Sequence, residues 1–324
     1  MSGTHRTPTG DHGTDRTSRS GKRRMLRREI PGTIGLLADP GDFAAMRRYR
    51  SFAFDDHQDY LRHVDELLRS LAAQGIHTTV ALFDPEEYAD FCAEQRLDPD
   101  SAASRSRFTA ELAGTGPGLP YTGRPIDEIV PLLIDEAVRQ ATWEYATALL
   151  ADLGTCADCG EDIGRSSFER AADLLTRLVR GAGPGHHHLV CSIPTKDRQL
   201  LAVLHTESPA HPPGHSPASA GPDGPDRTPR PDGRDSLDFV TVLAAGLALG
   251  GPGGLVLRTT GAGSGDRVHG WRLDRGRLVP LSAAAVFNAY CTDADTGEPV
   301  APEHGVEHCP GYEVDDPDPH HGRR

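Results

Sequence analysis

The chain has 324 residues and a formal net charge of −13, and its 36 Gly and 26 Pro together make up about a fifth of the sequence. That share exceeds the ~12% usual in globular proteins, so much of the length is expected to be loop. Residues 1–28 carry a charge of +6, which leaves −19 on residues 29–324. Because an acidic surface repels phosphate backbones, composition argues against nucleic acid binding by the body of the protein.

The N-terminal segment, residues 1–28, is polar and basic and has few apolar side chains, so we expect a disordered arm. Its Arg23-Arg24 pair lacks the apolar run of ~7–15 residues that a secretion signal needs. The longest uncharged run, residues 239–257, contains five glycines and is too interrupted for a membrane span. We therefore expect a cytoplasmic protein without a membrane segment. Six cysteines in that compartment favour metal binding or burial over disulfides.

Residues 29–124 alternate strand and helix patterns and are expected to form an α/β subdomain. A short apolar run at 33–38 predicts a strand, helical spacing at 56–73 predicts a helix, and β-branched residues at 76–83 predict a second strand. A strand, helix, strand succession of this length favours a parallel pair with a crossover helix, a βαβ unit. Further helices are expected at 84–96 and 101–113.

An Asp-Pro pair follows each of the two expected strands, at Asp39 and at Asp84. In an open parallel sheet, ligands bind beyond the carboxyl ends of the strands. The two carboxylates could therefore serve an enzyme acting on a small phosphorylated or nucleotide-like substrate, with Arg47 or Arg50 neutralising charge. Asp at an N-cap, Pro at the first helical position and an acid at the third also start a helix. We favour capping, since it accounts for all three residue types.

The region 125–206 is expected to hold a long helix and the first strands of an α+β subdomain. Residues 207–236, with eight Pro and four Gly in thirty positions, predict a disordered insertion. Residues 237–292 complete the α+β subdomain, and 293–324 predict a mostly disordered tail. The elements expected after residue 124 are helices at 126–153, 167–180, 237–249 and 282–290, and strands at 189–193, 200–206, 255–259 and 268–273.

The fold class that follows is α/β plus α+β. It has a βαβ-type N-terminal half, a C-terminal half with an antiparallel sheet and helices, and long disordered segments.

Four residues with the spacing C-x2-C-x28-H-x2-C form the strongest chemical motif: Cys156, Cys159, His188 and Cys191. Three thiolates and one imidazole match the tetrahedral ligand set of zinc, and His187 is a competing ligand. Residues 156–160 resemble a zinc-finger knuckle, although the expected intervening helix departs from that pattern. Four protein ligands would make the zinc structural. The alternatives are a redox-active thiol pair and no site at all.

A second pattern, His304, Glu307 and His308, matches the H-x-x-E-H form of inverted zinc proteases. That mechanism requires a helix, with both imidazoles on one face and the Glu as base. The stretch lies between Pro302 and Pro310, where a helix is not expected. We interpret the match as coincidental.

The leading functional hypothesis is a cytoplasmic, non-catalytic protein with a regulatory or interaction role, a structural zinc ion and an unidentified protein partner. The first alternative is the enzyme with a site at Asp39 and Asp84. The second is a DNA-associated regulator that uses the arm at residues 1–28, whose binding would weaken steeply with salt. A solubilising role for that arm is favoured by its composition.

Overall fold

A computed structural model describes residues 32–209, 233–261, 264–293 and 296–316 of the chain. The predicted arm at 1–28 and most of the predicted insertion at 207–236 lie outside these ranges. The described residues form two compact units, which divide between Gln140 and Ala141. Helices and mixed sheets make up both units, so the predicted mixture of α/β and α+β structure is confirmed.

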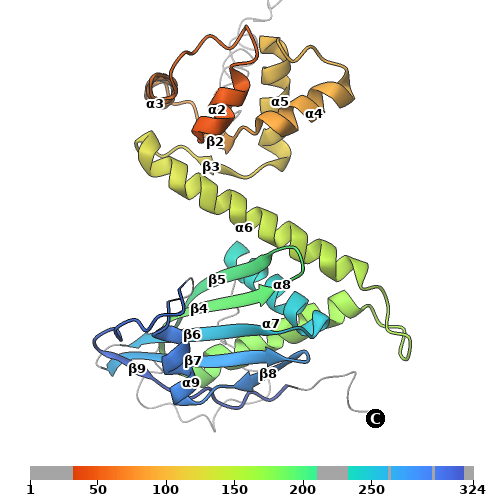
Figure 1. Ribbon diagram of the computed structural model, residues 1–324, viewed down its shortest axis with the longest axis vertical. Helices are drawn as coiled ribbons and strands as arrows, with labels where there is room; N and C mark the ends of the chain where they lie inside the picture. The colour runs from red at the N-terminus through yellow and green to blue at the C-terminus, as the bar shows by residue number, and fades with distance from the viewer. Residues whose placement is uncertain (1–31, 210–232, 262–263, 294–295, 317–324) are drawn as a thin grey trace, which may run out of the picture. The chain divides into compact units, whose positions relative to one another are not determined.

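The first unit contains a three-stranded sheet with the order β1-β2-β3. Strands β1 (Gly32–Leu36) and β2 (Thr78–Leu82) are parallel, as predicted, and β3 (Gly118–Pro120) runs antiparallel to β2. The crossover from β1 to β2 carries two helices, and two more precede β3 (Figure 1). These helices are α2 (Pro40–Met46), α3 (His57–Ala73), α4 (Pro85–Gln95) and α5 (Ala102–Thr115).

Aromatic side chains dominate the core of the first unit. The ring centroid of Phe83 lies 5.2 Å from that of Tyr88 and 5.0 Å from that of Phe108. A Cβ atom on Gly35 would come within 2.8 Å of the Phe83 ring, so β1 can pack this closely only with glycine at that position. Aromatic pairs at these separations stabilise the unit beyond simple area burial.

The helix α6 (Ile126–Asp152) contributes to both cores. Near its start, Ile129 and Leu133 are buried in the first unit, whereas Ala146 and Leu150 are buried in the second. Its bounds agree with the predicted helix at 126–153.

The second unit contains a six-stranded sheet with the order β5-β4-β6-β7-β8 and with β9 paired to β7. Neighbouring strands are antiparallel, as predicted, except that β9 is parallel to β7. The bounds are β4 (Gly185–Pro194), β5 (Gln199–Ser208), β6 (Gly253–Gly261), β7 (Ser264–Asp274), β8 (Arg277–Pro280) and β9 (Val306–His308).

Helices cover the two faces of this sheet unequally (Figure 1). The helices α7 (Ile163–Ala182) and α8 (Arg234–Leu249) pack on one face and bury the main core. The shorter α9 (Ala283–Tyr290) lies on the opposite face, where a Cβ on Gly270 would come within 3.1 Å of Val286. The sheet therefore has one fully covered face and one that α9 covers in part.

The C-terminal segment contains more structure than its composition predicts. The indole Nε1–H of Trp271 donates to the carbonyl of Tyr312 at 2.9 Å, and the Tyr312 hydroxyl donates to the carbonyl of Leu178. The guanidinium of Arg170 donates from Nε to Asp316 Oδ1 at 2.7 Å. These partners lie far away in the sequence, so a local composition rule does not reveal them.

Candidate metal centre

The Cys-x-x-Cys segment forms a tight hairpin between α6 and α7. Thr155 and Asp162 form an antiparallel bridge at its base, and Cys156 N–H donates to the carbonyl of Glu161 at 2.8 Å. The turn closes where Gly160 N–H donates to the carbonyl of Cys156 at 2.8 Å. Gly160 has φ +74°, a left-handed conformation that glycine adopts without steric cost. The glycine after the second cysteine therefore shapes this turn, as the knuckle interpretation expects.

Two contacts fix the base of the hairpin. The carboxylate of Asp162 accepts a hydrogen bond from Arg165 N–H at 2.7 Å, which caps the N-terminus of α7. A Cβ on Gly164 would lie 2.6 Å from the carbonyl oxygen of Leu150, so α6 and α7 approach closely at this glycine. The hairpin is thus anchored between two helix ends.

The two thiols of the hairpin differ in exposure, Cys156 being half-buried and Cys159 exposed. The backbone N–H groups of Cys159 and Asp158 donate to the Cys156 sulfur and lower the pKa of that thiol. The N–H of Glu161 donates to the Cys159 sulfur and favours its thiolate, but desolvation and the neighbouring Cys156 raise the pKa of Cys159 overall. Backbone donors of this kind orient thiolates and offset their charge when they bind a metal.

The other two predicted ligands lie on opposite faces of β4. Successive side chains of a strand alternate between faces, so residues three apart cannot point the same way. Cys191 is fully buried in the main core, and burial raises its pKa to about 12. His188 is exposed on the other face, and its ring stacks on that of His205 at 4.4 Å. His188 and Cys191 are therefore not brought together as a chelating pair.

The competing candidate, His187, lies on the buried face with both ring nitrogens engaged. Nε2 lies 3.1 Å from the carbonyl of Gly183, and Nδ1 lies 3.0 Å from the hydroxyl of Thr259. Because a carbonyl can only accept, Nε2 carries the proton and Nδ1 accepts from the Thr259 hydroxyl. Burial lowers the pKa of His187. In the part of the chain that the structure describes, no three or more His, Cys, Asp or Glu side chains form a group able to hold a metal.

The carboxylates of Asp39 and Asp84 cap helices. Asp39 Oδ1 accepts from Gly41 N–H at 2.6 Å, and Asp84 Oδ1 accepts from Glu86 and Glu87 N–H at 2.7 and 3.2 Å. The capping interpretation of both Asp-Pro pairs is confirmed. Desolvation raises the pKa of Asp42, and the nearby carboxylates of Asp84 and Asp39 raise it further.

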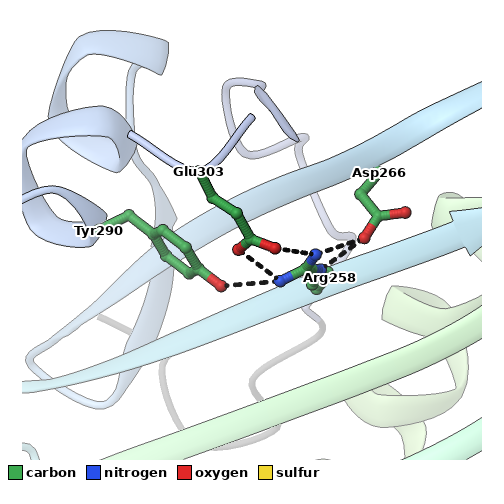
Figure 2. A network of polar contacts seen from close by, with 4 residues as sticks. All are labelled: Arg258, Asp266, Tyr290 and Glu303. Atoms are coloured by element: carbon green, nitrogen blue, oxygen red, sulfur yellow. Dashed lines mark hydrogen bonds and ion pairs between the residues drawn. The ribbon is translucent and has the colours of Figure 1, made fainter. Parts of the chain in front are cut away.

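A polar network on the α9 face of the sheet had no sequence signal (Figure 2). Arg258 donates from Nε to Asp266 Oδ2 at 2.8 Å and from Nη1 and Nη2 to the two carboxylate oxygens of Glu303 at 2.9 Å. Its Nη1 also lies 3.4 Å from the hydroxyl of Tyr290. These hydrogen bonds raise the pKa of Arg258 and lower the pKa of Glu303. The network ties α9 and the C-terminal segment to β6.

The histidines of the H-x-x-E-H pattern do not lie on a helix. Glu307 and His308 belong to β9, and His304 precedes it on an exposed turn. The expectation that no helix forms here is confirmed.

An apolar groove of about 390 Å³ lies beside the cysteine hairpin. Its lining comes from α6, α7, α8 and the hairpin base, and it includes Trp143, Leu150, Phe168, Leu237 and Asp162. Asp162 thus belongs both to the groove and to the bridge that closes the hairpin.

The family model of a domain of unknown function (DUF8829) matches residues 21–124. The matched part corresponds to the sheet and helices of the first unit and ends before the cysteine hairpin. No curated protein and no solved structure matches the chain. Among the described helices, none is long and apolar enough to cross a membrane.

Proposed function

We propose that this protein is a non-catalytic zinc-binding protein with a regulatory or interaction role, and that Cys156 and Cys159 are zinc ligands. The observation that supports the proposal is the hairpin itself. It carries two thiols separated by two residues, and backbone N–H groups donate to both sulfurs.

The shape of the hairpin favours zinc over thiol–disulfide chemistry. Redox-active Cys-x-x-Cys pairs usually open a helix directly after a strand. Here both cysteines precede α7, inside a hairpin closed by Thr155 and Asp162. A turn with N–H donors to sulfur suits two thiolates on one tetrahedral ion. A zinc–thiolate site also requires reduced cysteines, which agrees with the expected cytoplasmic location.

The proposal assigns Asp39 and Asp84 to helix capping and gives them no catalytic role. Each carboxylate already accepts backbone hydrogen bonds from its own helix. The hypothesis of a DNA-associated regulator depends on residues 1–28, which lie outside the described residues.

Metal analysis of the full chain, purified under reducing conditions without chelator, tests the proposal. We expect zinc in the wild type and at least about a tenfold loss of zinc affinity in Cys156→Ser or Cys159→Ser, because each substitution removes a ligand. Cys309→Ser is the matched control, since Cys309 is also only partly buried. Zinc content near zero, or unchanged content in Cys156→Ser, would contradict the proposal.

Alkylation separates the zinc site from a redox pair. Bound zinc should protect two thiols from a mild alkylating reagent until a chelator is added. A disulfide between Cys156 and Cys159 that forms reversibly in the wild type, with no zinc present, would instead indicate redox chemistry.

A further inference from the structure

We propose that two copies of this chain share one zinc ion, each copy contributing Cys156 and Cys159. The inference rests on the proposed function, because it names the partner that completes the same site. A structural zinc ion takes four protein ligands in tetrahedral geometry, and one hairpin supplies two. Two identical half-sites related by a two-fold axis give the full set, a Cys₄ site.

The position of the cysteines favours a contact between copies. From Thr155 to Asp162 every residue of the hairpin is exposed except Cys156, which is half-buried. Two residues next to the sulfurs are small: Ala157 follows Cys156, and a Cβ on Gly160, which follows Cys159, would meet nothing within 4 Å. Small side chains at the tip allow two hairpins to approach until four sulfurs surround one ion.

The Zn–S bonds make this contact dependent on the metal, because the charge of the two acidic tips opposes it. Each hairpin carries Asp158, Glu161 and Asp162, so two tips without a cation repel each other. Zinc replaces the four thiol protons, which pass to solvent, and bonds directly to all four sulfurs. We therefore expect the chain without zinc to show no association through this surface.

The groove beside the hairpin supplies apolar area for the same contact. Because Asp162 lines the groove and closes the hairpin, a second chain held at the cysteines lies next to Trp143, Phe168 and Leu237. The side chain of Leu237 is 46% exposed in one copy, an apolar surface that association would cover. The occupant of this groove is thus a second copy of the chain.

Native mass spectrometry of the full chain under reducing conditions, titrated with zinc chloride, tests the proposal. We expect monomers after chelator treatment and dimers that hold about one zinc for two chains at saturation. Cys156→Ser and Cys159→Ser should abolish the zinc-dependent dimer, whereas Cys309→Ser should leave it unchanged. Sedimentation velocity gives the same comparison in solution.

The outcomes separate the two proposals. Monomers that bind one zinc each, with loss of binding in Cys156→Ser, would support the zinc site and overturn its sharing between copies. No zinc binding at all would overturn both. A dimer of equal strength with and without zinc would overturn sharing.

Mixing wild-type and variant chains provides a second test of whether two copies share the zinc ion. Wild-type chain and a mass-tagged Cys156→Ser/Cys159→Ser double variant should form no mixed dimer with zinc. Mixed zinc dimers would mean that the two cysteines of one chain suffice, which contradicts the proposal. A circular dichroism spectrum equal to that of the wild type checks that the double variant is folded.

Discussion

The two units use their conspicuous polar motifs in opposite ways. In the first unit, the carboxylates of Asp39 and Asp84 face the backbone N–H groups of their own helices. In the second unit, Cys156 and Cys159 lie in a short hairpin, the first half-buried and the second exposed. Carboxylates at the starts of their own helices explain local structure, whereas two thiols separated by two residues in a hairpin match the spacing of a pair of zinc ligands.

The largest expected effect on stability comes from substituting one of two cysteines of the second unit, Cys191 and not Cys156. Cys191→Ser places a hydroxyl in the apolar core and should lower the free energy of unfolding by about 2 kcal/mol. Cys156→Ser in the metal-free chain should change it far less, because that site is outside the core. Urea unfolding followed by tryptophan fluorescence measures both, since Trp143 and Trp271 lie in the second unit. Equal changes in the free energy of unfolding would contradict the distinction between the core cysteine and the hairpin cysteine.

Acid should destabilise the second unit through His187. Its pKa in the folded protein is below the ordinary value of 6.5, so below pH 6.5 the unfolded chain binds a proton that the folded chain does not. Stability is therefore lost as pH falls, by at most about 1.4 kcal/mol per pH unit. The His187→Gln variant should show a flatter dependence than the wild type. Identical slopes in the two proteins would refute this assignment.

Removing a cap should have a smaller effect, confined to the first unit. Asp84→Ala removes the acceptor for two N–H groups and should cost about 1 kcal/mol. Asp39→Ala removes the acceptor for one and should cost less. Hydrogen exchange of the backbone amides of α4 and α2, measured in the full chain, reports the loss of stability in each helix separately. A loss of stability in the second unit of similar size would argue against purely local capping.

The smallest expected effect concerns the Arg258 network. The Glu303 side chain is 51% exposed, so Glu303→Gln should cost less stability than the loss of either cap, and the difference should shrink with added salt. Tryptophan fluorescence in urea at low and high salt measures it. A larger cost that salt does not reduce would show that the network is essential to the sheet.

Most secondary structure was predictable from the sequence, because its signals are local. Asp84-Pro85 and Ser282 mark helix starts, and the helix at 126–153 agrees with α6 almost to the residue. The short strands β3, β8 and β9 were missed. Three or four residues give too little periodicity to recognise, and the partners of β3 and β9 are distant in the sequence. The partner of β8 is adjacent, since Arg277 pairs with Asp274 across a two-residue turn.

The candidate site was predictable in part. The hairpin cysteines were identified because two thiols and a glycine lie within five residues. The pairing of His188 with Cys191 required knowledge of strand faces, and the alternation of side chains along β4 separates them. The Arg258 network joins residues from β6, β7, α9 and the C-terminal segment, so no local sequence pattern predicts it.

The central claim, that zinc is held by the cysteines of two hairpins, is tested most directly by zinc K-edge X-ray absorption on the zinc-loaded full chain. We expect four sulfur neighbours at about 2.3 Å. Two sulfurs accompanied by nitrogen or oxygen neighbours at about 2.0–2.1 Å would contradict it.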